Sequence, residues 1–292
     1  MSSSETSGII HSIFSGAVNA MFYMPDSTRR MLTFTASEAV GYPDSITVSN
    51  GAFKAISSLE PGSAVIITGS QLSFPDIRLE LDIPMEQIKY STIRLPNPPA
   101  LQPIDMNGFI ASLQGFCGNK FNKSGFLHLP DTIRASVTNG LQLFAQAWAE
   151  SDTILMEALL SAHIGIGIGL TPSSDDAFLG IMAVFSYCRE YAGITPLQDN
   201  PQFQLWSALP PISSLTPFYR LLEGRTTDVS IKYLCCAQEG RYSDAILHLL
   251  EALNFTGQAI TPRLIDLAHA GGTSGQDTLF GMNIACRVLQ NY

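Results

Sequence analysis

The sequence predicts an α+β protein in which a small β-rich N-terminal domain is followed by a larger, all-α C-terminal domain. Short stretches rich in β-branched residues dominate residues 10–95, and beyond residue 105 apolar residues recur at three- and four-residue spacing. Between these regions, four prolines fall within residues 95–103. So many prolines fit neither a helix interior nor a central strand, so we predict domains at 1–97 and 98–292.

The N-terminal domain is predicted from short β-like segments separated by Gly, Pro and Asn turns. These segments are residues 31–37, 45–49, 63–68 and 77–81. Together they predict a small barrel or sandwich. The acidic residues of this domain are scattered and His11 has no partner nearby in the sequence. We therefore interpret the domain as a framing or docking module rather than as the catalytic part of the chain.

The C-terminal domain is predicted to begin with three helices, each of which opens on an aspartate. They span residues 105–117, 131–150 and 152–163. The second carries an apolar stripe that is typical of a core-facing helix, formed by Ile133, Val137, Leu141, Phe144, Ala145 and Trp148. Further helices are predicted at 176–191, which should be central and buried, and at 215–223, 228–239, 242–254, 261–270 and 274–290. Residues 195–217 are predicted to form a long connection, either plain surface packing or a lid or partner contact.

Composition restricts the partners of the chain. Its 292 residues include 16 Lys+Arg against 25 Asp+Glu, and the net charge of −9 argues against nucleic acid or an anionic membrane as the main partner. The five cysteines (Cys117, Cys188, Cys235, Cys236, Cys286) lack CxxC spacing, which favours reduced, mostly buried thiols. The N-terminus lacks an export signal and no apolar run approaches about 20 residues, so a cytoplasmic location is expected.

Two related segments contain the candidate binding and catalytic residues. Residues 165–180 read GIGIGLTPSSDDAFLG, and residues 271–281 read GGTSGQDTLFG. Aligned on their acids, both contain Ser-x-x-Asp-x-x-x-Gly: Ser173, Asp176 and Gly180 correspond to Ser274, Asp277 and Gly281. Each Ser/Asp pair marks a helix start, and glycines allow a ligand to approach the backbone. We hypothesise that the two helix starts face each other and form the site.

Each motif alone has a structural explanation, because Ser-x-x-Asp resembles a capping box and an acid in the first turn favours the helix dipole. The Gly-x-Gly-x-Gly run does not follow a strand, which excludes a dinucleotide-binding fold, and no Walker lysine is present. A helix start that follows a glycine-rich loop instead suits the binding of an anion, or of a cation that is held by carboxylates. A serine nucleophile is disfavoured because no base is placed beside either serine, and His163 is best explained as a histidine satisfied at a helix end.

A second candidate patch precedes the helix predicted at 228–239. Arg225 stands beside Thr226 and Thr227 there, and an arginine fork next to hydroxyls suits phosphate or carboxylate. A solvated surface arginine is the alternative.

The segments GIGLTPSSDDAFLG, RTTDVS and GTSGQDTLFG together resemble the AllH-like family, formerly a domain of unknown function and now linked to oxamate carbamoyltransferase. In that family the first motif usually reads Gly-Leu-Thr-Pro-Ser-Gly-Asp-Asp, and here Ser174 replaces the glycine. The last motif usually reads Gly-His-Ser-Ser-Gly-Trp-Asp, and here Gly272 and Gln276 replace the histidine and tryptophan.

The resemblance implies a subunit of a hetero-oligomeric transferase that exchanges a carbamoyl group between phosphate and oxamate in anaerobic allantoin and purine degradation. Its expected partners are carbamoyl phosphate or oxamate and other carbamoyltransferase subunits. The expected anion-binding residues are Gly167, Gly169, Thr171, Ser173, Ser174, Arg225, Thr226, Thr273, Ser274 and Gly275. Asp176 and Asp277, with Asp175 beside them, are the expected catalytic acids.

Two alternatives remain open at this level. Because carboxylates repel anions, Asp175, Asp176 and Asp277 would instead bind Mg²⁺ in a magnesium-dependent hydrolase, as the acids of ADP-ribosylglycohydrolases do. The chain would alternatively be a non-catalytic scaffold whose β-rich domain docks a partner.

Overall fold

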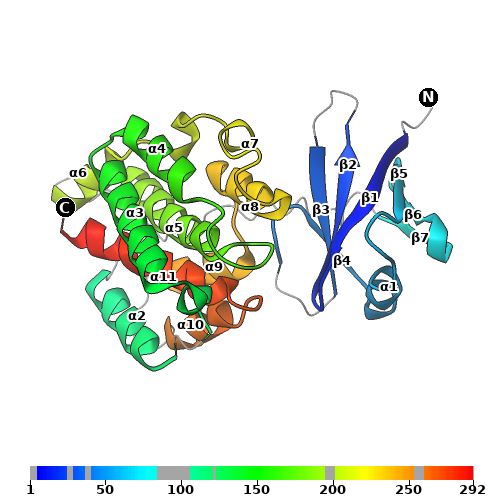
Figure 1. Ribbon diagram of the computed structural model, residues 1–292, viewed down its shortest axis with the longest axis horizontal. Coiled ribbons are helices and arrows are strands. Elements are labelled where there is room, and N and C mark those ends of the chain that lie inside the picture. Colours follow the sequence, from blue (N-terminus) through cyan, green and yellow to red (C-terminus); the bar gives the residue numbers. More distant parts are fainter. Residues whose placement is uncertain are drawn as a thin grey trace. The chain divides into compact units, whose positions relative to one another are not determined.

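The computed structural model describes residues 5–24, 29–36, 41–83, 106–120, 123–194, 201–252 and 260–291. By its internal contacts the chain divides into two compact units, Met1–Ile93 and Arg94–Tyr292. Each is considered by itself below (Figure 1). The boundary expected at residues 97 and 98 lies outside the described residues, so the precise division stays a prediction.

The N-terminal unit is a single seven-stranded sheet with the order β4-β3-β2-β1-β5-β6-β7. Its strands are β1 (Glu5–Ile13), β2 (Ala17–Tyr23), β3 (Arg29–Ala36), β4 (Ser45–Val48), β5 (Ala64–Thr68), β6 (Gln71–Phe74) and β7 (Leu79–Asp82). Neighbouring strands are antiparallel except β3 and β4, which are parallel. Of the two predicted alternatives, a barrel or a sandwich, the sandwich is wrong, because the described residues form one sheet and not two packed sheets.

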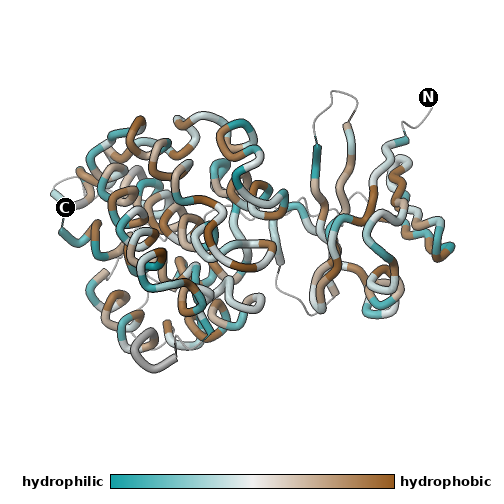
Figure 2. Tube along the Cα trace, viewed as in Figure 1, coloured by the Kyte–Doolittle hydropathy of each residue, from teal (hydrophilic) through white to brown (hydrophobic). Residues whose placement is uncertain are grey.

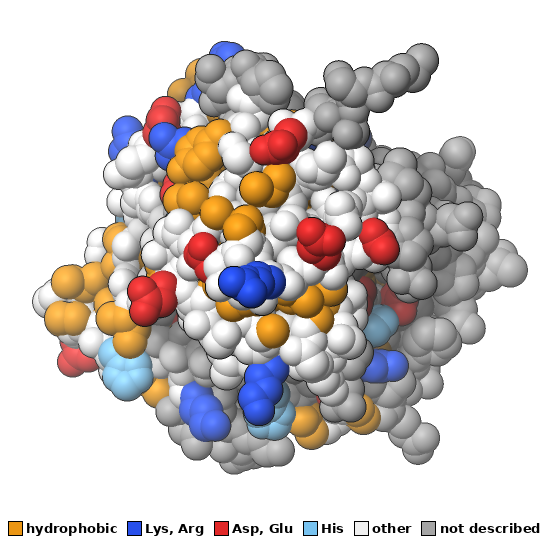
Figure 3. Space-filling model, turned by 90° about the vertical axis from the view of Figure 1, so that its right-hand side faces the viewer, with side chains coloured by type: hydrophobic (Ala, Val, Ile, Leu, Met, Phe, Trp, Pro, Cys, Tyr) orange, Lys and Arg blue, Asp and Glu red, His pale blue; other side chains and the backbone are white. Residues whose placement is uncertain are grey.

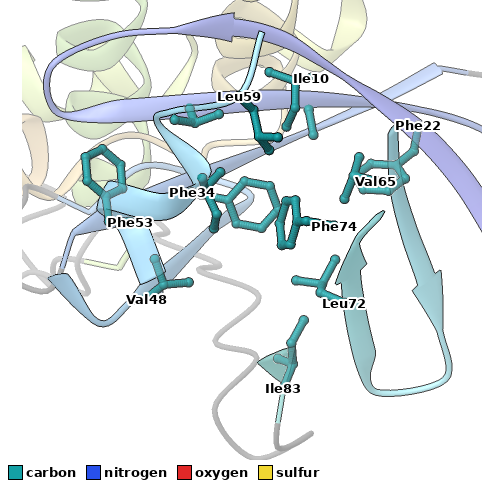
Figure 4. Packing of buried hydrophobic residues seen from close by; sticks show 13 residues of the cluster. Ile10, Phe22, Phe34, Val48, Phe53, Leu59, Val65, Leu72, Phe74 and Ile83 are labelled. Carbon is teal, nitrogen blue, oxygen red and sulfur yellow. The ribbon is translucent and has the colours of Figure 1, made fainter. Parts of the chain in front are cut away.

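The sheet curls around its own hydrophobic core (Figure 4). Phe34 of β3 and Phe74 of β6 are separated by three intervening strands, yet their ring centroids lie 5.5 Å apart in an edge-to-face contact. Only a strongly curved sheet brings such distant strands together. The short helix α1 (Asn50–Ile56), which is capped by Ser49, adds the buried Phe53 and Ile56 to this core.

The four predicted strands correspond to β3, β4, β5 and β7, whereas β1, β2 and β6 were not individually predicted. The burial of β2 explains its omission: five consecutive residues from Val18 to Phe22 are buried, so the strand lacks the polar–apolar alternation of a half-exposed strand. The segment predicted at 77–81 begins with a 3-10 turn, η1 (Pro75–Ile77), so its strand starts only at Leu79.

The second unit is helical in its described residues, as predicted. Its helices are α2 (Met106–Lys120), α3 (Asp131–Ala149), α4 (Thr153–His163), α5 (Ser173–Ile194), α6 (Pro201–Ser207), α7 (Phe218–Leu221), α8 (Asp228–Gln238), α9 (Asp244–Ala252), α10 (Ile260–Ala268) and α11 (Ser274–Gln290), with 3-10 turns η2 (Gly125–His128) and η3 (Ile212–Ser214). Figure 2 shows that these helices carry both apolar and polar residues.

Helix α5 is the buried centre of this unit, and it packs on α11, α3, α6, α8 and α9. From α3, Phe144 contacts Phe178 edge-to-face at 5.0 Å, and Trp148 stacks on Phe185 at 4.8 Å. The apolar stripe predicted on α3 is therefore core, with one correction: Ile133, close to the start of the helix, is 42% exposed.

The connection predicted at 195–217 is wrong for its described part, because α6 lies within it. Pro201 is tolerated as the first residue of α6, where a backbone N–H has no helical partner. Phe203 and Trp206 are buried one turn apart, and the Phe203 ring lies 5.6 Å from that of Tyr191. Residues 195–200 lie outside the described residues.

Four cysteine side chains are described and all are free thiols, as expected; Cys188, Cys236 and Cys286 are buried and Cys235 is half-buried. Burial raises the pKa of Cys235 to about 11. The Cys117 side chain lies outside the described residues. No helix in the described part of the chain has the length and apolarity needed to cross a membrane. On the face seen in Figure 3, the described acidic and basic side chains are interspersed rather than gathered by sign.

Candidate functional site

The starts of α5 and α11 lie side by side because the two helices cross at a pair of glycines. A side chain at Gly180 of α5 would collide with the carbonyl oxygen of Thr278, and one at Gly281 of α11 would collide with the carbonyl oxygen of Ala177. The relation is reciprocal, since each glycine meets the residue that follows the aspartate of the other motif. These glycines therefore allow the close approach that aligns the two motifs (Figure 1).

Across this crossing, the serine of each motif also lies near the aspartate of the other motif. The hydroxyl of Ser274 on α11 lies near Asp176 on α5 and lowers its pKa, and the hydroxyl of Ser173 on α5 does the same for Asp277 on α11. Thr171, just before α5, joins them, because its Oγ1 lies 2.7 Å from Ser274 Oγ. The structure thus brings together the residues that the sequence placed about a hundred positions apart.

The alternate glycines of the loop before α5 all have positive φ angles. The φ angles of Gly165, Gly167 and Gly169 are +79°, +135° and +97°, which other residues rarely adopt. At Gly167 a Cβ would also collide with the backbone nitrogen of Ser173. The sequence GIGIG is therefore needed to fold the loop back over the start of α5.

Asp175 fastens this loop to the start of α8. Its Oδ1 accepts the Gly165 N–H at 2.6 Å and the Ser174 hydroxyl at 3.0 Å, and its Oδ2 accepts the Thr226 hydroxyl. Asp175 as a residue is only 2% exposed. Burial raises its pKa, and the Thr226 and Gly165 hydrogen bonds partly oppose that shift. Asp175 is thus occupied by the protein itself.

The patch predicted at Arg225 and Thr226 lies behind the loop. The Thr227 hydroxyl donates to the Leu170 carbonyl, and Gly165 packs against the Arg225 carbonyl. The exposed Arg225 guanidinium donates to the Ser161 carbonyl at the end of α4, at 3.4 Å. In this arrangement Thr226 and the Arg225 backbone position the glycine loop, and the guanidinium bonds α4 rather than the paired motifs.

Asp277 is anchored by a segment that sequence reasoning missed. Its Oδ1 accepts the Ser124 hydroxyl at 2.5 Å, and its two oxygens lie 3.1 and 3.2 Å from the Gly125 nitrogen. Gly125 begins η2, and a side chain there would collide with Ser173 Oγ. The only sequence signal was a Ser-Gly pair with no acid or histidine beside it, so nothing marked it as part of the site.

Asp176 differs from Asp277 in having a buried oxygen with no partner. Among the described residues nothing hydrogen-bonds to Asp176 Oδ2 or to the neighbouring Ser173 Oγ. Burial, followed by the nearby charge of Asp277, raises the pKa of Asp176 well above its ordinary value, while Ser274 and Thr171 oppose the shift. Burial also raises the pKa of Asp277. No salt bridge to a described residue neutralises this acidic pair.

The surface above the acids, which we call the rim, consists of residues 167–171 and 271–274. Gly169 and Gly272 are exposed, whereas Thr171, Thr273 and Ser274 are half-buried. None of the rim's backbone N–H groups donates to another described residue. The rim therefore offers N–H and hydroxyl donors to solvent, which is the chemistry of an anion site.

Two family models match the chain. The model described as oxamate carbamoyltransferase subunit AllH matches residues 163–286, and the model described as the AllH family N-terminal domain matches residues 1–88. Together they cover more than half of the sequence. The chain belongs to the AllH family. The comparison with solved structures finds no match.

The AllH match includes both motifs, the rim and Thr226, whereas Ser124 and Gly125 lie outside both matched regions. Two departures from the family's motifs have a visible structural use in this AllH chain. Ser174 Oγ accepts the Ile166 N–H at 2.9 Å, and Gln276 Oε1 accepts the Lys123 N–H at 3.0 Å. Gly272, the third departure, is exposed and makes no contact that a side chain would disturb.

The metal and nucleophile alternatives concern the same aspartates and His163. No group of three or more His, Cys, Asp and Glu among the described residues could hold a metal ion. The reason is visible in the contacts, since Asp175 and Asp277 face protein N–H and O–H donors. His163 Nδ1 pairs with the Leu159 carbonyl at 2.9 Å and its ring packs on Gly140, so it is a satisfied histidine at the end of α4.

Proposed function

We propose that this chain is the subunit of an oxamate carbamoyltransferase that binds a small anionic substrate at its rim. The observation that carries the proposal is the meeting of two helix starts whose rim N–H groups donate to no other described residue, beside the paired hydroxyls of Thr171 and Ser274. The AllH family description supports the assignment to the transferase. The complete enzyme would exchange a carbamoyl group between phosphate and oxamate, and the substrate would be carbamoyl phosphate or oxamate.

The proposed reaction explains why such a rim is useful. Transfer of a carbamoyl group between two anions develops negative charge on the carbonyl oxygen in a tetrahedral transition state. Backbone N–H groups that already point at that oxygen stabilise the charge without having to reorganise. Residues 167–171 are held in place by the bonds of Asp175 and Thr227, so their N–H groups are preorganised.

The roles that we assign follow from position. Rim N–H groups at Gly167 and Gly169, with the hydroxyls of Thr171 and Ser274, would bind the anion. Asp175, Ser174 and Thr226 would hold the loop, as their hydrogen bonds indicate. The guanidinium of Arg225 donates to Ser161 here, so the positive charge that the reaction requires would come from another subunit of the complex.

The proposal is tested by reconstitution with the other subunits of the transferase. We expect no carbamoyl transfer from carbamoyl phosphate to oxamate by the purified chain alone, and activity when its partners are added. In the assembled enzyme, Thr171→Val and Ser274→Ala should each raise KM at least several-fold, because each removes a rim hydroxyl. Asp131→Asn, at an exposed first-turn aspartate of α3, is the matched control. Wild-type kinetics in both rim variants would favour a scaffold instead.

A further inference from the structure

The two aspartates that occupy equivalent positions in the paired motifs are treated differently by the protein. Asp277 receives the Ser124 hydroxyl and the Gly125 N–H from η2. Asp176 receives no such segment, and its Oδ2 has no hydrogen-bond partner among the described residues although the residue is 5% exposed. A buried carboxyl oxygen without a partner is costly, and the cost is much larger for an ionised carboxylate than for the neutral acid.

The unpaired carboxyl lies directly beneath the rim. The hydroxyls of Thr171 and Ser274 lie 2.7 Å from each other, and both are close enough to Asp176 to lower its pKa. Both residues are half-buried, whereas Asp176 is only 5% exposed. A ligand on the rim would therefore contact this hydroxyl pair first and would affect Asp176 through it.

The number of hydroxyl protons limits the hydrogen bonds that Thr171, Ser274 and Asp176 can form with each other and with a ligand. Thr171 and Ser274 supply one hydroxyl proton each. If Asp176 is ionised it can only accept, so one hydroxyl proton goes to the carboxylate and the other to the bond between the hydroxyls. No hydroxyl proton then remains for an anion. If Asp176 is protonated, it donates to one hydroxyl oxygen, and the hydroxyl protons can turn toward the ligand.

We propose that Asp176 is neutral when a small anion occupies the rim, and that its carboxyl proton is donated to the Thr171–Ser274 hydroxyl pair, which then binds a ligand carboxylate or phosphate. The inference rests on the proposed function, since it concerns the same anion site. It assigns Asp176 as a positioning residue whose protonation gives the hydroxyls their donor role. It also removes the conflict between buried acids and an anionic substrate.

The charges around Asp176 agree with this assignment. Asp277 faces it from α11 and Asp175 lies beside it on α5, and both charges oppose ionisation. Of the charges on the elements packed against α5, those of Asp277 and Asp175 have the largest effects on the pKa of Asp176. Lys232 of α8 lies over the ring of Tyr233. An arriving anion would add further negative charge, so binding should take up a proton.

The experiment is calorimetric titration of the full-length chain with oxamate and, separately, with inorganic phosphate. Each titration is run in two buffers of different ionisation enthalpy, at several pH values. We expect uptake of up to one proton per bound anion, and an affinity that falls about tenfold per pH unit above the pKa of Asp176. Asp176→Asn should bind within about threefold of wild type with no proton uptake, because the amide is a permanent neutral donor. Asp131→Asn should behave as wild type.

Several results would overturn the inference. Anion binding by wild type without proton uptake at pH values above the pKa of Asp176 would do so, as would a more than tenfold loss of affinity in Asp176→Asn with an unchanged circular dichroism spectrum. Infrared spectroscopy gives a test without ligand: near pH 7 the carbonyl band of a protonated carboxyl should be present in wild type and absent in Asp176→Asn. If neither anion binds, absence of that band overturns the inference and its presence supports the neutral group. A failed transferase assay alone would contradict only the proposed function.

Discussion

The starts of α5 and α11 share a motif and a reciprocal packing arrangement, yet they differ in what completes them. At the start of α11, Asp277 accepts hydrogen bonds from Ser124 and Gly125, so its carboxyl group is bonded within the protein core. At α5, the equivalent Asp176 keeps an unpaired oxygen under the rim. The comparison teaches that two copies of one Ser-x-x-Asp-x-x-x-Gly pattern can differ in whether a neighbouring segment pairs the aspartate.

The part that the two turns share is the crossing at Gly180 and Gly281, and breaking it should have the largest effect. A methyl group at either position would meet a backbone carbonyl that belongs to a packed helix. We expect Gly180→Ala and Gly281→Ala each to lower the free energy of unfolding by about 3 kcal/mol or more. Urea denaturation measures this. Gly115→Ala on α2, where the added methyl group meets nothing, is the control and should be neutral or slightly stabilising.

The next test separates the two acids. Asp277→Ala would leave the buried Ser124 hydroxyl and Gly125 N–H without an acceptor. We therefore expect a loss of about 2–3 kcal/mol in the free energy of unfolding. Asp176→Asn should cost little or be stabilising, because no buried donor depends on Oδ2 and the repulsion of Asp277 is removed. If urea denaturation showed equal destabilisation by the two substitutions, the different hydrogen bonding of the two aspartates would not affect the free energy of unfolding.

A third test uses pH, and its sign follows from the raised pKa of Asp176. Its carboxyl binds a proton more tightly in the folded chain than in the unfolded chain, where the ordinary value is 3.8. The stabilisation is therefore complete below about that value and is lost as pH rises through the folded pKa. Over that window wild type should lose up to about 1.4 kcal/mol per pH unit from this group. Asp176→Asn should show a correspondingly flatter curve, with Asp175 and Asp277 contributing the remaining slope.

The sequence was sufficient for the parts of the site that are local. Helix starts, the glycine loop and the pairing of the two motifs follow from short patterns, and the fold class follows from a change in apolar period. The segment at Ser124 could not be predicted, because a serine and a glycine acquire meaning only through contact with Asp277, which is 153 positions away for Ser124. The direction of the Arg225 side chain is likewise a tertiary property, since its acceptor is the Ser161 carbonyl of another helix.

The smallest expected effect concerns the second residue of each motif, which is Ser174 in α5 and Gly275 in α11. Ser174 Oγ accepts the Ile166 N–H and donates to Asp175, whereas Gly275 is pressed against the Leu267 carbonyl, where a side chain would collide. Ser174→Gly, which restores the family's usual residue, should therefore cost only about 1 kcal/mol of stability, through one lost hydrogen bond and a glycine in the first turn. Oxamate affinity, measured by calorimetry, should change less than threefold, because Asp175 still holds Gly165 and Thr226. Gly275→Ser should be far more destabilising, and if the two substitutions proved equally mild, the α11 turn would be less tightly packed than its contacts indicate.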